Sequence, residues 1–314
     1  MNAKYLVTGG AGFIGSRIVA RLVEAGACVR VVDNLSTGDV NRLNSLLSNI
    51  EFLEGDLADE EIANRAVTGI DYVLHQAAIP SVQRSIREPL RSNRSNVVAT
   101  LNLLESCRIH GVARMVYAAS SSVYGNTAVL PKQEDMPANP MSPYALQKFV
   151  GERYARMYYD FFGVETVCLR YFNVFGPGQD PRSEYSAVIP KFIDNLLTGA
   201  TLTIFGDGEQ SRDFTYVDNI VDANLSALKA PNAAGQVCNV GCGARVSLNS
   251  LVSVLETIIG CKASVEYQPA RLGDVRDSQA DISRARTLLS YSPQIAIEDG
   301  LRRTVDWFRA QRPA

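Results

Sequence analysis

Short hydrophobic runs and amphipathic stretches alternate along the first half of the chain. The runs, rich in β-branched and aromatic residues, predict strands at residues 4–9, 28–33, 50–56, 71–78, 114–120 and 165–172. The stretches between them have helical spacing, as at residues 13–26 and 95–111, where Gly26 and Gly111 suit helix C-caps. This alternation predicts a parallel sheet covered by helices on both faces, which is a doubly wound α/β fold.

The pattern changes after about Tyr171, where loops rich in Gly, Pro and Asp appear at residues 173–185 and 205–214. Shorter helices and strands are expected at residues 188–199, 201–205, 238–241, 248–260 and 264–268. These features predict a smaller α/β domain that holds a ligand over the edge of the sheet, because loops at such edges carry function.

Composition and charge narrow the possibilities. The chain has 314 residues, 46% of them hydrophobic, which is enough to bury a large core. Its 31 basic and 33 acidic residues give a net charge of -2, so no overall field attracts nucleic acid or an anionic membrane. Six scattered cysteines without a CxxC pair, and only two histidines, predict a reduced chain without a metal site. Because neither a signal-peptide pattern nor a membrane-spanning apolar run is present, we expect a cytoplasmic protein.

A glycine-rich segment joins the first predicted strand to the first predicted helix. Gly9, Gly12 and Gly15 lie three residues apart in the sequence TGGAGFIG. Glycine allows a tight turn, a close approach of the backbone to a pyrophosphate and close packing of the helix on the strand. The first turn of the helix then offers unpaired N–H groups to phosphate. Asp33 ends the second strand 24 residues after Gly9, where its carboxylate can bind ribose hydroxyls.

Glycine triplets also occur in turns that bind nothing, but here glycine spacing, strand, helix and acid agree on a Rossmann-type dinucleotide site. The residues after Asp33 are Asn34, Leu35 and Ser36. None of them is an arginine that would meet a 2′-phosphate, which favours NAD over NADP. Asp56 ends the third strand and is placed to meet the adenine amino group. As an alternative, its carboxylate caps the helix that follows.

A tyrosine and a lysine are expected one helical turn apart near the middle of the chain. Ser142 suits the N-cap and Pro143 the first position of a helix, which puts Tyr144 and Lys148 on one face. A tyrosine with an ordinary pKa of about 10 is a weak base at neutral pH unless a positive charge stabilises its phenolate. Lys148 can supply that charge. The alternative is an ordinary amphipathic helix, because this spacing is common.

The fifth predicted strand ends in a cluster of serines, in the sequence AASSSVYG that begins at Ala118. Open α/β sheets bind ligands at the carboxyl ends of their strands. A serine hydroxyl beside Tyr144 can bridge to a substrate oxygen and relay a proton. Serines also end strands in ordinary turns, which is the alternative explanation.

Together these motifs resemble the extended short-chain dehydrogenases/reductases that act on nucleotide sugars. The resemblance covers nearly the whole chain and rests on TGGAGFIG at 8–15, Asp33, HQAA at 75–78, SSSVYG at 120–125, Tyr144 with Lys148, and RYFNVFGPG at 170–178. It implies an NAD-binding Rossmann domain over residues 1–172 and a UDP-sugar-binding domain over residues 173–314, with an interleaved boundary.

The resemblance assigns roles to individual residues. It implies Ser120, Tyr144 and Lys148 as the catalytic residues. Around NAD it implies Gly9, Gly12, Phe13, Ile14, Gly15, Asp33, Asn34, Ser36, Thr37, Gly38, Asp56, Leu57, Gln76, Ala77, Ala78, Asn96, Tyr144, Lys148 and Tyr171. Around the UDP-sugar it implies Ser81, Ser121, Asn173, Val188, Lys191, Thr203, Phe205, Arg212, Arg271, Asp274 and Ser278.

The residues predicted to bind the substrate also have purely structural explanations. Arg212 and Arg271 suit a diphosphate because arginine binds phosphate oxygens with a planar fork, and Asp274 can hold ribose hydroxyls. Isolated Arg/Asp pairs in loops are otherwise solvated salt bridges of small energy. The residues that the resemblance places around the uracil can equally pack in a core; these are Val188, Lys191, Thr203 and Phe205.

Ser278 bears on the choice of sugar. In family members specific for UDP-glucose and UDP-galactose, a bulky tyrosine occupies this place, whereas a small residue leaves room for an N-acetyl group. The segments at 81–85, 188–192 and 275–281 look most like bacterial UDP-N-acetylglucosamine 4-epimerases. A cavity permits a substituent without requiring it, so UDP-glucose with UDP-galactose, and UDP-glucuronate, stay open as alternatives.

The resemblance implies a 4-epimerase in which Tyr144 takes the 4-hydroxyl proton through or beside Ser120 while hydride passes from C4 to NAD⁺. A dehydratase or decarboxylase is disfavoured, because those enzymes carry an acid where this chain has Ser122. A non-catalytic NAD-sensing module is disfavoured by the Tyr144 and Lys148 pair. The resemblance also implies a homodimer through helices at 93–110 and 142–163, although residues 98–107 could equally face the sheet.

Overall fold

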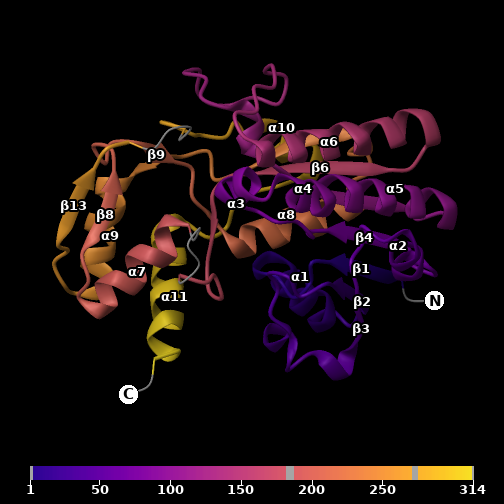
Figure 1. Ribbon diagram of the computed structural model, residues 1–314, viewed down its shortest axis with the longest axis horizontal. Coiled ribbons are helices and arrows are strands. Elements are labelled where there is room, and N and C mark those ends of the chain that lie inside the picture. The colour runs from indigo at the N-terminus through magenta and orange to yellow at the C-terminus, as the bar shows by residue number, and fades with distance from the viewer. Residues whose placement is uncertain (1–2, 182–186, 271–274, 313–314) are drawn as a thin grey trace.

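A computed structural model describes residues 3–181, 187–270 and 275–312. Its largest element is a parallel sheet of seven strands, in the order β11-β6-β5-β4-β1-β2-β3 (Figure 1). The strands are β1 (Lys4–Thr8), β2 (Cys28–Asp33), β3 (Ile50–Glu54), β4 (Tyr72–His75), β5 (Arg114–Ser120), β6 (Thr166–Tyr171) and β11 (Gln236–Val240). The doubly wound α/β fold expected from the sequence is confirmed, and each of the six expected strands is present.

The two faces of the sheet bury alternate residues of each strand. On β5, Val116 and Ala118 pack towards one side, and Met115, Tyr117 and Ala119 towards the other. The first face is covered by α1 (Phe13–Glu24), α8 (Val217–Lys229) and α10 (Ser283–Leu289). The second is covered by α2 (Glu60–Val67), α5 (Ala99–His110) and α6 (Pro143–Phe162). Burial of each large apolar side chain stabilises this layered core by about 1.5–3 kcal/mol.

The assignment of residues 238–241 to the smaller domain is wrong. Strand β11 pairs in parallel with β6, with Cys238 opposite Leu169, and so extends the large sheet. Val237, Cys238 and Val240 are buried there. A short apolar run carries no local signal of which sheet it joins, because pairing depends on residues far away in the sequence. The division of the chain near residue 172 stays a prediction.

The smaller part has its own core (Figure 1, orange to yellow). Its two-stranded parallel sheet joins β8 (Leu202–Phe205) to β13 (Val265–Gln268), and its helices are α7 (Val188–Thr198), α9 (Leu248–Ile259) and α11 (Ile297–Ala310). Apolar side chains from these elements, such as Ile193, Leu251 and Val305, bury one another. Two short pairs, β7 (Val174–Phe175) with β10 (Thr215–Tyr216) and β9 (Ser211–Arg212) with β12 (Val246–Ser247), connect to it.

The expected helix C-caps are also observed. Gly26 and Gly111 both have left-handed φ angles, of 73° and 65°. The expected helix at 95–111 is divided, because a π-helical turn at Arg94–Val98 precedes α5. Two short helices, α3 (Val82–Arg87) and α4 (Pro89–Asn93), come before it.

The structure also bears on the cysteines and on membrane and metal sites. The six cysteines are free, and Cys107, Cys168 and Cys238 are buried. In residues 3–181, 187–270 and 275–312 no cluster of His, Cys, Asp and Glu has the makings of a metal site. Within the same ranges, none of the helices has both the length and the apolar character to traverse a bilayer.

Candidate active site

The carboxyl ends of the sheet strands open into a cavity of about 1120 Å³. Residues at or just after the ends of β1, β2, β4, β5 and β6 line it, and the strand order reverses between β1 and β4. Open α/β sheets bind ligands at such a switch point. The predicted site residues on its wall are Gly9, Gly12, Phe13, Ile14, Gly15, Asp33, Asn34, Ser36, Thr37, Gly38, Asp56, Leu57, Gln76, Ala77, Ala78, Ser81, Ser120, Ser121, Tyr144, Lys148, Tyr171, Asn173, Arg212 and Ser278.

The glycine loop between β1 and α1 forms part of this wall. Gly9 has a left-handed φ of 65°, and a Cβ atom on it would lie 2.7 Å from the backbone of Ala77. A Cβ atom on Gly15 would lie 2.1 Å from the carbonyl oxygen of Gly9. Gly12 is the N-cap of α1 and has no side chain to bond the first N–H groups of the helix. The loop therefore presents bare backbone and helix N–H groups to the cavity, which fits the phosphates of a dinucleotide.

Asp33 carries the carboxylate expected to bind ribose. Its oxygens accept hydrogen bonds from the N–H groups of Ala11, at 3.0 Å, and Leu35, at 2.9 Å. Burial raises the pKa of Asp33, although these hydrogen bonds and the charge of Arg42 oppose the rise. Arg42, which sequence reasoning missed, lines the cavity and donates to the carbonyl oxygens of Ala11 and Gly178. Because its partner Gly178 is far away in the sequence, no local motif identifies Arg42 as a residue of the site.

Asp56 lies on the cavity wall at the end of the third strand region. Its carboxylate accepts a hydrogen bond from the N–H of Ala58 at 2.9 Å. The alternative, that Asp56 caps the following helix, is wrong, because Asp59 is the N-cap of α2 and accepts from the N–H of Glu61. Asp56 therefore lines the cavity and does not cap α2. Its contact with adenine stays a prediction.

Asn96 is the predicted cofactor residue that the structure does not bring to the cavity wall. Its side chain is buried, accepts a hydrogen bond from the N–H of Ile79 at 2.8 Å and donates to the side chain of Gln147 at 2.9 Å. Asn96 therefore joins the loop after β4 to helix α6. A direct contact with the cofactor stays a prediction.

The three predicted catalytic residues meet at the carboxyl end of β5. As expected, Ser142 is the N-cap of α6 and Pro143 is its first residue, which places Tyr144 in the first turn and Lys148 one turn later. Ser120 is the last residue of β5, and its Oγ lies 2.8 Å from Ser122 Oγ. The Ser120 hydroxyl and the Tyr144 phenol both line the cavity, which suits a proton relay through a ligand oxygen bound there.

Burial is the main influence on the pKa values of both Lys148 and Tyr144. The Nζ atom of Lys148 donates to the carbonyl oxygen of Ala118 at 2.8 Å and lies 5.1 Å from the ring centre of Tyr117. Burial lowers the pKa of Lys148 to about 7. Burial also raises the pKa of Tyr144, and the hydrogen bond with Ser120 only partly opposes this. Desolvation thus opposes ionisation of Tyr144, and the expectation that the positive charge of Lys148 helps to stabilise its phenolate stays a prediction.

On the substrate side, Asn173 and Ser278 are brought together from distant parts of the sequence. Asn173 has a left-handed φ of 27°, and its amide donates to Ser278 Oγ at 3.1 Å and to the carbonyl oxygen of Asp213 at 3.2 Å. Both Asn173 and Ser278 line the cavity. This contact fixes the position of the small Ser278 side chain.

Asp213 connects three backbone positions near Asn173 and Ser278 through its carboxylate. Its side chain is completely buried and accepts hydrogen bonds from the backbone N–H groups of Cys242, Gly243 and Ala280, at 2.8, 2.9 and 3.1 Å. Burial raises its pKa to about 6, against the lowering effect of these bonds. Sequence reasoning did not identify this role of Asp213, because the three donors belong to segments that meet only in the fold.

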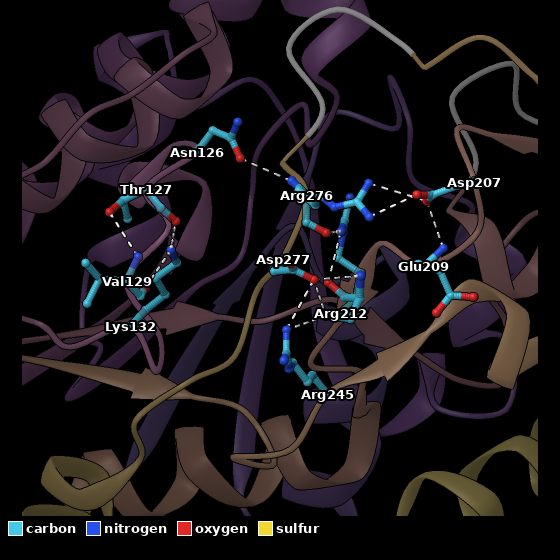
Figure 2. A network of polar contacts seen from close by, with 11 residues as sticks. Asn126, Thr127, Val129, Lys132, Asp207, Glu209, Arg212, Arg245, Arg276 and Asp277 are labelled. Atoms are coloured by element: carbon cyan, nitrogen blue, oxygen red, sulfur yellow. Dashed lines mark hydrogen bonds and ion pairs between the residues drawn. The ribbon is translucent and has the colours of Figure 1, made fainter.

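A network of charged side chains lies beside Arg212 (Figure 2). Arg212 donates to the carbonyl oxygen of Arg276 at 2.8 Å, and Arg276 pairs with Asp207 at 3.0 Å. Arg245 lies 3.3 Å from a carboxylate oxygen of Asp277. Acidic side chains thus pair with Arg276 and Arg245, whereas Arg212 lines the cavity, where its guanidinium can bind an anionic ligand.

The residues expected around the uracil are not on the cavity wall. Val188 and Lys191 lie in the first turns of α7, and Thr203 and Phe205 lie on β8. Val188 packs against the core of the smaller part, which is the alternative foreseen for it. Two further predictions, Arg271 and Asp274, lie outside the described residues.

Several wall residues were not anticipated. They come from the segments after β5, β6 and β7 and from the segment that contains Ser278, where no motif separates them from ordinary loop residues; examples are Tyr124, Lys132, Met141, Phe172, Gln179 and Val275. Lys132 is buried, and its Nζ donates to the carbonyl oxygens of Thr127 and Val129 (Figure 2).

Comparisons with known proteins agree with this geometry. A profile of the NAD dependent epimerase/dehydratase family matches residues 5–241. The UDP-glucose 4-epimerase of Mycolicibacterium smegmatis is 40% identical over 97% of this chain and 98% of its own. The structure of UDP-N-acetylglucosamine 4-epimerase from Methanobrevibacter ruminantium, in complex with UDP-N-acetylmuramic acid, has a TM-score of 0.94 and 39% identity, covering 99% of both chains.

A third similar protein is the UDP-glucuronic acid 4-epimerase of Bacillus cereus, solved in complex with UDP-glucuronic acid and NAD. It has a TM-score of 0.92 and 34% identity, covering 98% of this chain and all of its own. The profile and the relatives thus extend over both the large sheet and the smaller part. The chain belongs to the NAD-dependent epimerase/dehydratase family, among its nucleotide-sugar 4-epimerases.

Proposed function

We propose that the chain interconverts UDP-N-acetylglucosamine and UDP-N-acetylgalactosamine in the cytoplasm. The observation that carries this choice of sugar is the small side chain of Ser278, which lines the cavity beside Asn173. A side chain of this size leaves room for an N-acetyl group, whereas a tyrosine would fill the space. The likeness to the UDP-N-acetylglucosamine 4-epimerase of Methanobrevibacter ruminantium supports the same choice.

Two other substrate pairs are the second candidates. The relatives that act on UDP-glucose and UDP-glucuronic acid are similarly close to this chain, at 40% and 34% identity. Both reactions would use the same catalytic residues, so only the sugar pocket separates the three possibilities. A dehydratase stays disfavoured because of Ser122.

The cofactor side of the cavity accounts for NAD. The backbone around Gly9, Gly12 and Gly15 and the N-terminus of α1 would bind the pyrophosphate, since a Cβ atom at Gly9 or Gly15 would obstruct this backbone. Asp33 would bind the adenosine ribose, and Asp56 the adenine. The remaining predicted residues of this wall would enclose the nucleotide.

Tyr144 and Ser120 would move the proton of the sugar 4-hydroxyl. Because burial raises the pKa of Tyr144, its phenol needs a further positive charge to act as a base at neutral pH. When bound, NAD⁺ supplies that charge and a hydride acceptor for C4, from which hydride can return to the opposite face of the sugar. Ser120, which lines the cavity together with Tyr144, would hold the sugar oxygen in line. Proton transfer of this kind contributes about 10²–10⁴-fold to a rate.

The substrate contacts follow the predicted set. Arg212 would bind the diphosphate and Asn173 a phosphate oxygen. Ser81 and Ser121, which line the cavity, would contact the sugar. Arg271 and Asp274 would bind diphosphate and ribose, and the uracil would be enclosed by Lys191, Thr203 and Phe205, whereas Val188 packs against the smaller core.

A homodimer is part of this proposal. Residues 99–107 of α5 mostly face the sheet, which is the alternative foreseen for them. Large apolar side chains are nevertheless exposed on both helices of the predicted interface, with Ile109 of α5 57% and Phe161 of α6 75% accessible. A second copy of the chain would cover this apolar surface. Sedimentation of the wild type and of Phe161→Asp tests it: the wild type should be a dimer and the variant a monomer.

The sugar is tested by proton NMR of the full chain with each UDP-sugar in turn. The proposal predicts the largest kcat/KM for UDP-N-acetylglucosamine. Ser278→Tyr should lower that value at least about 10-fold, since the pocket loses the space for the N-acetyl group, and should spare UDP-glucose. Equal turnover of all three sugars, or loss of UDP-glucose turnover in Ser278→Tyr, would contradict the assignment.

A further inference from the structure

We infer that Arg170 is a positioning residue for the proton relay. It links the helix that carries Tyr144 and Lys148 to the turn that follows Ser120. The inference rests on the proposed roles of Ser120 and Tyr144. It concerns Arg170 and Glu152, which do not line the cavity, and Tyr124, which does.

The first link is a buried ion pair with α6. Glu152 lies one turn beyond Lys148, so Tyr144, Lys148 and Glu152 recur at every fourth residue along one face of the helix. Arg170 on β6 binds both carboxylate oxygens of Glu152, with Nε at 2.8 Å and Nη2 at 2.7 Å. Both side chains are almost fully buried, at 5% and 3% accessible. A bidentate fork fixes angle as well as distance, so it sets the position of the helix on the sheet.

The second link runs to the turn after Ser120. The remaining donor of Arg170, Nη1, bonds the hydroxyl of Tyr124 at 2.8 Å, and its guanidinium lies 4.8 Å from the centre of that ring. Tyr124 ends the 3-10 turn that Ser120 caps, and its hydroxyl donates to Asn239 on β11 at 2.6 Å. The guanidinium of Arg170 therefore binds both α6, which contains Tyr144, and the turn that Ser120 caps.

Stability alone gives a weak reason for this arrangement. The desolvation penalty of a buried ion pair often cancels its Coulombic gain, so an apolar replacement of similar volume can be equally stable. The fork contributes geometry instead. The transfer of a proton between Tyr144, Ser120 and a sugar oxygen depends on distances near 3 Å. A small shift of α6 against β5 would therefore slow the chemical step and leave ligand binding in place.

The chain offers a matched control at the other end of the same strands. Arg114 is the first residue of β5 and is itself buried; its Nε donates to Glu165 at 2.9 Å, just before β6 begins. Its Nη1 donates to the carbonyl oxygens of Ala227 and Ala230. This pair has the same residue types as Arg170 with Glu152, but Glu165 is 44% exposed and accepts both bonds through one carboxylate oxygen. It lies at the amino ends of the strands, and neither residue lines the cavity.

The experiment compares Arg170→Lys with Arg114→Lys in the full, NAD-loaded chain. Lysine keeps the positive charge but cannot form the bidentate hydrogen bonds that the guanidinium makes with Glu152. We expect kcat of Arg170→Lys to fall by about 10²-fold, as for a misplacement near 1 Å, with KM and NAD affinity within about twofold of the wild type. Arg114→Lys should lower the melting temperature and leave kcat unchanged. A kcat of Arg170→Lys within twofold of the wild type, or an equal loss in Arg114→Lys, would overturn the inference.

A milder variant covers the case in which Arg170→Lys does not fold. Tyr124→Phe keeps the ring and the ion pair but removes the hydroxyl link, and its kcat should fall by about 3–10-fold at unchanged KM. An unchanged kcat would overturn the inference. Tyr144→Phe separates the two levels of the proposal: if it is inactive while Arg170→Lys and Tyr124→Phe are fully active, only the positioning role fails.

Discussion

The cofactor side and the substrate side of the cavity are built in different ways. The cofactor side comes from strand ends and the turns that follow them, as at Gly9, Asp33 and Gln76, and each contributes through its local sequence. The substrate side joins Asn173, Arg212 and Ser278, which come from separate loops and are held together by hydrogen bonds across the fold. The first arrangement is imposed by backbone geometry, and the second depends on a few buried polar contacts.

The largest expected effect breaks the backbone geometry of the cofactor side. In Gly15→Ala, the new Cβ atom would lie 2.1 Å from the carbonyl oxygen of Gly9, so the loop must move. We expect NAD affinity to fall more than about 100-fold, because the helix N-terminus can no longer meet the phosphates. Gly26→Ala at the other end of α1 is the control, since its Cβ atom meets nothing within 4 Å. It should cost only about 1–2 kcal/mol of stability. Isothermal titration with NAD measures the difference.

The next effect belongs to the substrate side. Asp213→Asn keeps the size of the side chain but turns one oxygen into an NH₂ group that faces backbone donors. The lost and unsatisfied hydrogen bonds should cost about 1–3 kcal/mol. We expect a higher KM for the UDP-sugar and a lower melting temperature at unchanged NAD affinity. A variant that loses NAD affinity as much as UDP-sugar affinity would show that the two sides are not independent.

How far the sequence predicts each side follows the same division. The glycine spacing, Asp33, the Ser142 cap and the Tyr144/Lys148 turn are local patterns, and the structure places each of them as expected. Strand β11 was assigned to the wrong part of the fold, and Arg42 and Arg170 were not identified as structural links. Their partners are far away in the sequence, so single-chain periodicity carries no information about them. The burial that raises the pKa of Tyr144 likewise emerges only in the packed fold.

A smaller effect concerns the buried amine between the two sides. The pKa of Lys148 is lowered from 10.5 to about 7 by burial, so between these values the unfolded chain binds more protons than the folded chain. The free energy of unfolding should therefore rise with pH in this window, by at most about 1.4 kcal/mol per pH unit. Lys148→Met removes this contribution. Chemical denaturation at pH 7 and pH 9 measures it, and equal pH slopes for both proteins would contradict the shift.

The smallest expected effect concerns the exposed ion pair of Arg276 and Asp207, beside Arg212. Arg276 and Asp207 pair at 3.0 Å, but both side chains are more than half exposed. Such pairs contribute about 0–1 kcal/mol, so Arg276→Ala should change the melting temperature by no more than a degree or two. A larger fall in melting temperature would mean that this ion pair, like Asp213, stabilises the substrate side of the cavity.

The central claim is that Tyr144 carries the proton of the sugar 4-hydroxyl. Proton NMR of UDP-N-acetylglucosamine incubated with Tyr144→Phe tests it most directly, with NAD and UDP-sugar binding measured on the same sample. The account predicts that turnover falls by about 10²–10⁴-fold while both ligands still bind as they do to the wild type. Turnover at the wild-type rate would contradict it.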